Sequence, residues 1–316
     1  MHQEKPRVGI SSCLLGEKVR YDGGHKLDHY LHDVLGPFVT WVPVCPEVEC
    51  GFPVPREAMR LVGSPLNPRL VTSRTGQDHT NRMRAWAEKR TQQLEQEDLC
   101  GFIFRAGSPS SGMRGVKVYN DNGVIKQGVG MFAAAFMAHF PSVPVEDDGR
   151  LNDAVLRENF IERVFVYQRW QEFLNNDGSL GGLVTFHAEH KLLIMAHSPK
   201  TLTFLGQLVA TAKQKVKKAL FQDYLQHLME ALRCNATVKK NRNVLQHGMG
   251  YFKKVLSADE KKELDEVIVN YGKGFIPLIV PITLIQHYVR KYKEPYLQTQ
   301  RYLYPHPLEL MLRNHC

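Results

Sequence analysis

A chain of 316 residues is long enough for two domains with separate cores, and a hydrophobic content of 43% excludes a chain that is disordered throughout. No window reaches the ~18 uninterrupted apolar residues of a membrane-spanning helix, so we expect no transmembrane segment. The net charge of +9 is uneven, because residues 1–150 hold 18 Lys and Arg against 17 Asp and Glu, whereas residues 151–316 hold 23 against 15.

The first half alternates between strand-like and helical patterns. Three apolar runs predict strands, at residues 8–10, 39–45 and 99–104. Helical spacing at residues 78–97 predicts a helix between the second and third strands, and a helix near residues 130–140 and a strand at residues 143–145 follow. This βαβ order predicts an α/β domain with a mostly parallel, Rossmann-like sheet over residues 1–148, and we place a linker near residues 146–157.

The second half predicts helices without strands. Two stripes of apolar residues at spacings of three and four indicate amphipathic helices, formed by Phe221, Leu225, Leu228 and Leu232 and by Leu264, Val267, Ile268 and Tyr271. Ser257 and Glu260, three residues apart, match a capping box before the second stripe. We therefore expect an all-α domain over residues 158–316.

Each of the three predicted strands ends in a polar loop. Cys13 follows the first strand, Cys45 and Glu47 follow the second, and a loop of small residues at 107–112 follows the third. Because ligands bind outside the carboxyl ends of parallel strands, we expect these loops to meet at one site. On these residues alone, the cysteines can equally serve packing, and the serine loop can be an ordinary turn or an anion-binding nest.

The motifs in these loops carry a family resemblance. They are residues 9–16 (GISSCLLG) with residues 20–24 (RYDGG), residues 43–47 (PVCPE), and residues 107–112 (GSPSSG). Together they resemble the thiouracil desulfurase (TudS) family over most of residues 5–145. The second half, with residues 186–191 (FHAEHK) and 276–281 (IPLIVP), looks like the YbgA-type helical domain that is found fused to TudS. The combination is similar to the RudS-type tRNA 4-thiouridine desulfidases.

This resemblance implies an iron–sulfur enzyme. In the family, three cysteines, one from each loop, hold a 4Fe–4S cluster whose fourth iron has no protein ligand. Such an iron is a Lewis acid that takes the soft sulfur of a thiocarbonyl and polarises the adjacent carbon towards water, which gives uridine and sulfide without net redox change. The resemblance makes Cys13 and Cys45 ligands, Glu47 the proton-transfer carboxylate and Ser108 a hydrogen-bonding residue of the pocket.

Three further polar residues are implied as substrate contacts. They are Asp22, Arg56 and Arg105, and for each the alternative is a structural salt bridge.

The third loop departs from the family pattern. Ser111 stands where the family has its third cysteine ligand. Serine is a poor replacement because its hydroxyl holds the proton tightly and its oxygen is hard, so the affinity for the cluster should fall. Three explanations are open: an engineered substitution, a natural weak oxygen ligand, or compensation by Cys50 or Cys100. Cys100 is disfavoured, because a strand of about six residues puts it roughly 20 Å from the loop.

The basic second half suggests that RNA is the partner. Residues 287–304 interleave tyrosines with four candidate RNA-binding cations, Arg290, Lys291, Lys293 and Arg301. Cations meet phosphates and rings stack on bases, so this composition suits RNA. Lysines at residues 213–218 and basic residues at 239–242 form further clusters. Each cluster alone can be a solvated helix face, and several tyrosines can belong to the core.

Three histidines share a predicted helix face, namely His187, His190 and His197. Their spacing is not a recognised zinc pattern, so we favour core positions or RNA contacts over a metal site.

The leading hypothesis is a tRNA 4-thiouridine desulfidase with a 4Fe–4S cluster. The alternatives are a desulfurase of free thiouracil and a non-catalytic tRNA-binding protein that has lost a ligand. Six scattered cysteines suit a reducing compartment, and the N-terminus lacks the pattern of a secretion signal. We therefore expect a cytoplasmic protein, with tRNA carrying 4-thiouridine as its partner and no membrane association.

Overall fold

The computed structural model describes residues 4–314 and divides the chain into two compact units, Met1–Asp153 and Ala154–Cys316. The segment expected as a linker is folded: it contains strand β8 (Val145–Asp147), a 3₁₀ turn (Arg150–Asn152) and the beginning of helix α4 (Ala154–Asn176). Within the described residues, no helix combines the length and the apolar character needed to cross a membrane.

The first unit contains a parallel sheet of four strands in the order β2-β1-β5-β8. The first three are β1 (Arg7–Ser11), β2 (Thr40–Val44) and β5 (Gly101–Phe104). This confirms the predicted α/β fold, although β5 and β8 each begin two residues later than expected. Strand β2 pairs with one edge of β1, and β5 pairs with its other edge, so the order of the strands reverses direction between β1 and β5. The carboxyl ends of β1 and β5 therefore flank a topological switch point.

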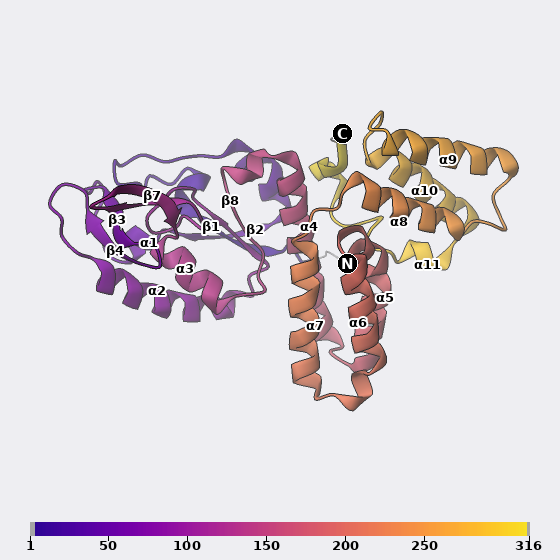
Figure 1. Ribbon diagram of the computed structural model, residues 1–316, viewed down its shortest axis with the longest axis horizontal. Coiled ribbons are helices and arrows are strands. Elements are labelled where there is room, and N and C mark those ends of the chain that lie inside the picture. Colours follow the sequence, from indigo (N-terminus) through magenta and orange to yellow (C-terminus); the bar gives the residue numbers. More distant parts are fainter. Residues whose placement is uncertain (1–3, 315–316) are drawn as a thin grey trace. The chain divides into compact units, whose positions relative to one another are not determined.

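Aromatic packing holds this sheet against its helices. Helix α3 (Met131–His139) places Phe132 and Phe136 on Phe102 of β5, with ring centroids 5.7 and 4.7 Å apart. Helix α2 (Thr80–Leu94) lies beside α3 and contributes Trp86, whose ring centroid is 5.4 Å from that of Phe132 (Figure 1). The central strands β1 and β5 are buried on both faces, which explains why they read as continuous apolar runs.

A second sheet of four strands was not predicted. Its order is β4-β3-β6-β7, and its strands are β3 (Met59–Ser64), β4 (Asn67–Thr72), β6 (Val116–Asn120) and β7 (Gly123–Gly128). Two antiparallel hairpins, β3–β4 and β6–β7, are joined by parallel pairing between β3 and β6. Leu61, Leu70, Val116 and Val118 form its buried side with Met83 of α2.

The second unit is mostly helical, as predicted. After α4 its helices are α5 (Leu180–His197), α6 (Pro199–Ala210), α7 (Lys217–Leu232), α8 (Val238–Gly250), α9 (Ala258–Gly272), α10 (Ile279–Tyr292) and α11 (Pro295–Gln298). Both predicted apolar stripes contribute to one core around Trp170 and Tyr224, whose rings stack 5.4 Å apart. The predicted capping box is present, with Ser257 and Glu260 exchanging hydrogen bonds at the start of α9.

Candidate functional site

The loops after β1, β2 and β5 line one cavity of about 320 Å³. Seven of the eight residues that the sequence implied for this site lie on its wall: Cys13, Cys45, Glu47, Arg56, Arg105, Ser108 and Ser111. Cys13 sits in a 3₁₀ turn (Ser12–Leu15) directly after β1, and Glu47 in the short helix α1 (Pro46–Glu49) directly after β2. The parallel sheet therefore gathers residues that are up to about a hundred positions apart in the sequence.

Of the two cysteines of the cavity, Cys13 is buried and Cys45 is half-buried. Burial, with a smaller contribution from Cys45, raises the pKa of Cys13 to about 11. Burial also raises the pKa of Cys45, although hydrogen bonding by the backbone of Val48 opposes the shift. Since burial disfavours the bare thiolate, both side chains are protonated thiols at neutral pH unless a cation compensates their charge.

Ser111 completes the convergence of the three loops. Its side chain is buried, and its backbone N–H donates to Ser108 Oγ at 3.1 Å. At the three positions that the resemblance implies as ligands, the wall therefore offers two thiols and one hydroxyl. Among the described residues, no three His, Cys, Asp or Glu side chains are grouped so that they could hold a metal ion.

Neither remaining cysteine of this unit lines the cavity. Cys50 packs in the core of the second sheet, with its Sγ 3.7 Å from the carbonyl oxygen of Arg82. Cys100 precedes β5, at the end opposite the serine loop, and its Sγ lies 3.7 Å from the carbonyl oxygen of Asp98. The structure thus gives no support to compensation for Ser111 by either thiol.

Glu47 is held from both sides. Arg56 donates from Nε to Glu47 Oε2 at 2.8 Å and also contacts this oxygen through Nη2, while Ser110 Oγ donates to Oε1 at 2.9 Å. Ser108 Oγ lies 3.0 Å from Ser110 Oγ, so the serine loop and the carboxylate form one network. Arg56 is therefore the ionic partner of Glu47. The sequence interpretation missed the role of Ser110, for which the only signal was its place in the serine-rich loop.

The other two implied substrate contacts are also engaged within the protein. Arg105 donates to both oxygens of Asp148, at 3.1 and 2.7 Å. Asp22 is not among the residues of the cavity wall; it accepts from the N–H of Gly24 at 3.0 Å, which is the main cause that lowers its pKa. Its neighbour Arg20 does lie on the wall.

In the helical unit, the four candidate RNA-binding cations fall into two groups. Lys291 pairs with Glu260 and Arg301 pairs with Glu189, each at 2.7 Å. Arg290 and Lys293 are exposed. Of the tyrosines in this segment, Tyr288 and Tyr302 belong to the core.

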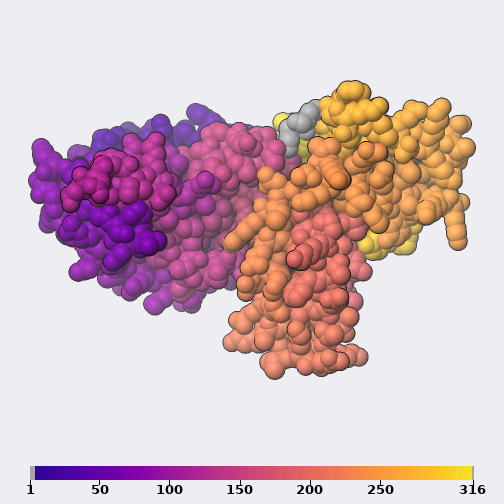
Figure 2. All heavy atoms as spheres, in the orientation of Figure 1, coloured from indigo at the N-terminus to yellow at the C-terminus, as the bar shows by residue number. Residues whose placement is uncertain are grey.

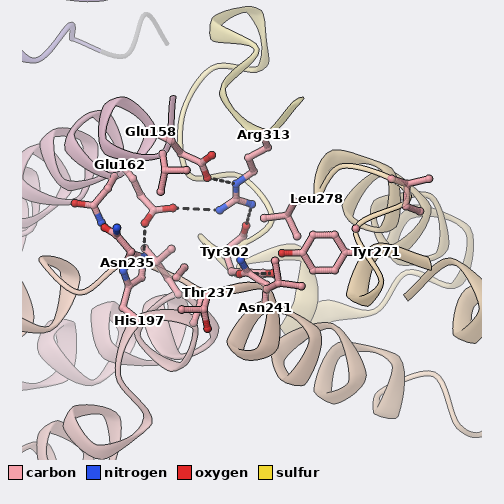
Figure 3. Close-up of a pocket in the computed structure, with 18 residues that line it drawn as sticks. Glu158, Glu162, His197, Asn235, Thr237, Asn241, Tyr271, Leu278, Tyr302 and Arg313 are labelled. Atoms are coloured by element: carbon pink, nitrogen blue, oxygen red, sulfur yellow. Dashed lines mark hydrogen bonds and ion pairs between the residues drawn. The ribbon is translucent and has the colours of Figure 1, made fainter. Parts of the chain in front are cut away.

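The helical unit contains a cavity of its own, of about 350 Å³. The charged residues that line it form hydrogen bonds and ion pairs with one another (Figure 3). Glu162 accepts from Arg313 Nη2 at 3.1 Å and contacts His197 Nε2 at 2.6 Å, and Arg313 also pairs with Glu158. Burial opposes ionisation of Glu162, but the charges of His197 and Arg313 outweigh it and lower the pKa of Glu162 to about 2. Through these two ion pairs, Arg313 is bound to helix α4, which carries Glu158 and Glu162.

The three histidines of the predicted helix face have separate partners. His187 Nδ1 lies 3.0 Å from Tyr224 OH, His190 Nδ1 lies 2.7 Å from the carbonyl oxygen of Phe186, and His197 belongs to the Glu162 network. All three are buried, which agrees with core positions.

Comparison with known proteins matches both units. Residues 8–148 match the family model described as 2-thiouracil desulfurase, and residues 191–307 match the model described as a protein of unknown function, DUF1722. The chain is 29% identical over 153 residues to YbgA of Escherichia coli K12, which covers 48% of this chain and 90% of YbgA. It is 28% identical over 150 residues to YbbK of Bacillus subtilis 168, which covers 46% of this chain and 97% of YbbK.

One solved structure is also similar in sequence. It is the 4Fe–4S-dependent thiouracil desulfidase TudS, with 32% identity, a TM-score of 0.39, and coverage of 48% of this chain and 94% of that protein. The two family matches therefore identify a 2-thiouracil desulfurase domain in residues 8–148 and a DUF1722 domain in residues 191–307.

Proposed function

We propose that this chain is a desulfidase that removes sulfur from 4-thiouridine in tRNA and releases uridine and sulfide. One observation carries the proposal: the loops after three neighbouring parallel strands bring Cys13, Cys45, Glu47 and Ser111 to a single cavity. The family match supports the reaction class, because its description names desulfurisation of a thiolated uracil. The assignment to tRNA rests on the basic helical unit.

The cavity fits an iron–sulfur cluster at two of the three ligand positions. Cys13, which is buried, and Cys45, which is half-buried, are soft donors that a cluster would convert to thiolates, whereas Ser111 offers a hard oxygen. When bound, the cluster would supply a Lewis-acidic iron with affinity for thiocarbonyl sulfur. We propose that Ser111 lowers the affinity for the cluster, so that this chain holds less iron than a variant with cysteine at this position.

The remaining wall residues suit proton transfer to and from the substrate. Arg56 and Ser110 fix both oxygens of Glu47, so the carboxylate is oriented before substrate arrives. Such a carboxylate can take a proton from the attacking water. Ser108, one hydrogen bond further, can hold the polar edge of the uracil ring.

The experiment compares three forms of the full chain after anaerobic reconstitution: wild type, Ser111→Cys and Ser111→Ala. We expect Ser111→Cys to take up the most iron and sulfide, and to desulfurise tRNA containing 4-thiouridine. Ser111→Ala should take up the least, because it retains no third donor. Absorption spectra and iron analysis report the cluster, and nucleoside analysis reports the product.

The alternatives give different outcomes. If Ser111→Cys binds a cluster and acts on free thiouracil but not on thiolated tRNA, the substrate is the free base. If it binds no cluster and leaves both substrates unchanged while the chain still binds tRNA, the enzyme proposal fails in favour of a non-catalytic tRNA-binding protein.

A further inference from the structure

The helical unit concentrates exposed lysines in one stretch of chain. Residues 190–222 contain no Asp or Glu and six lysines, which are Lys191, Lys200, Lys213, Lys215, Lys217 and Lys218. All six are exposed, and among the described residues only Lys215 has a carboxylate within ion-pair distance, at 4.0 Å from Asp223. An exposed positive stretch without acidic residues attracts a polyanion.

Four of these lysines lie at one end of the unit. Lys213, Lys215, Lys217 and Lys218 lie in and just after the turn between α6 and α7, at the free end of the projection that these two helices form together with α5 (Figures 1 and 2). The segment at 287–304, by contrast, has two of its four candidate cations in ion pairs. The α6–α7 hairpin is therefore the better electrostatic match for a phosphate backbone.

An open groove of about 730 Å³ runs between α5 and α6 towards the hairpin. Lys191 and Lys213 lie on its wall. The rest of the wall combines His187 with five small residues, Gly181, Ala188, Gly206, Ala210 and Ala212, and four larger apolar ones, Leu180, Val184, Leu202 and Val209. Small side chains allow a sugar–phosphate backbone to approach the helices closely, and the two lysines can meet its charge.

His187 provides a polar group on this wall. His187 Nδ1 and the buried hydroxyl of Tyr224 lie 3.0 Å apart, and either atom can be the donor, depending on the tautomer of the ring. Burial, with a contribution from Lys191, lowers the pKa of His187 to about 4, which keeps the ring neutral at pH 7. Nε2 faces Gly206 and has no hydrogen-bond partner among the described residues. It can therefore form a hydrogen bond with a ribose hydroxyl group, which both donates and accepts.

We infer that the groove between α5 and α6, together with the lysines of the α6–α7 hairpin, is the surface on which the backbone of tRNA docks. This inference rests on the proposed function, because that function supplies the polyanion. It assigns the contact to a surface that is distinct from residues 287–304.

The test compares two triple variants with the same change in charge. Lys213→Gln, Lys217→Gln and Lys218→Gln are combined in one, and Lys253→Gln, Lys254→Gln and Lys261→Gln, which are equally exposed, in the control. Binding of an unmodified tRNA transcript is measured by fluorescence anisotropy across a salt series. We expect the hairpin variant to bind at least about tenfold more weakly at low salt, with a slope of log Kd against log salt reduced by about two to three. The control should bind within about twofold of wild type.

A second pair of variants tests the groove itself. Val184, on the groove wall, is 51% exposed, and Val255, outside it, is 48% exposed, so both tolerate substitution. Val184→Glu should weaken tRNA binding severalfold, whereas Val255→Glu should not.

The outcomes separate this surface from the proposed function. Wild-type chain that binds no tRNA at any salt would overturn both. Wild-type chain that binds tRNA while the hairpin variant binds equally well, or while the control is weakened to the same degree, would overturn only the surface. If the hairpin variant loses binding to polyglutamate but keeps its affinity for tRNA, the surface serves an acidic protein and this inference fails.

Discussion

At the scale of single residues, the site depends on how its carboxylate is held. Arg56 and Ser110 occupy opposite oxygens of Glu47, and this arrangement could not be read from the sequence because the three residues come from three separate segments. The cysteines and the serine loop could be placed in loops after predicted strands, and the family resemblance supplied their roles. Their partners were not, because pairing between loops depends on tertiary contacts. Arg56, implied as a substrate contact with a structural salt bridge as the alternative, forms a salt bridge with Glu47.

Glu47→Gln tests the proposed proton transfer in the Ser111→Cys background. Glutamine keeps the shape but cannot take a proton, so turnover of thiolated tRNA should fall by roughly 10² to 10⁴-fold. Iron and sulfide content should stay unchanged, since Glu47 is not among the proposed ligands. A parallel loss of iron would show instead that the carboxylate supports the cluster. Thermal melting controls for the buried Arg56, which loses its ionic partner.

At the scale of elements, the contact between β1 and β5 determines where the loops lie. A Cβ added at Gly9 would lie 2.2 Å from Cδ2 of Phe102, so the two strands pair at normal spacing only because residue 9 has no side chain. The end of β1 is also linked to the third loop, because the N–H of Arg105 donates to Ser11 Oγ at 3.0 Å. Movement of β1 would therefore displace Cys13 from the serine loop.

Gly9→Ala should consequently lower the free energy of unfolding by about 1–3 kcal/mol, the usual cost of overpacking a core. In the Ser111→Cys background it should also reduce iron uptake. Gly36→Ala is the control, since a Cβ there would meet its nearest atom at 3.4 Å in a helical conformation. Urea denaturation measures both variants, and equal stability of the two would contradict the close contact at Gly9.

The elements also show where prediction from the sequence stops. The parallel strands were found because strands buried on both faces form continuous apolar runs. The second sheet was missed because its strands alternate over only five or six residues, and because Pro65 and Leu66 between β3 and β4 are not typical hairpin residues. The sequence at Asn122 and Gly123 was a turn signal for the β6–β7 hairpin that the interpretation did not use.

At the scale of the whole molecule, the core of the helical unit contains three histidines whose pKa values are lowered by burial. Burial lowers the pKa of His187 and of His306 to about 4 and that of His190 well below its usual value. In the unfolded chain these groups titrate near pH 6.5. Between these values the unfolded chain binds more protons than the folded chain, so the free energy of unfolding falls as the pH falls below about 6.5. Glu158 opposes this, because burial raises its pKa to about 7 and the folded chain keeps its proton.

Three histidines outweigh one carboxyl, so we expect the helical unit to lose stability between pH 7.5 and pH 5, by up to about 2 kcal/mol for each histidine. Trp170, which stacks on Tyr224, reports this unit once Trp41 and Trp86 are replaced by Phe, and urea denaturation followed by its fluorescence gives the free energy of unfolding. His190→Phe should reduce the pH dependence, because the buried imidazole is what resists protonation.

His247→Gln is the matched control, since His247 is exposed and should leave the pH dependence as it is in the parent chain. His190 stacks on Phe186 with ring centroids 4.0 Å apart, so phenylalanine can retain this packing while it removes the titrating group. A parent chain that is equally stable at both pH values would contradict the expectation. So would a pH dependence that His190→Phe leaves intact, because the acid sensitivity would then arise outside this cluster of buried rings.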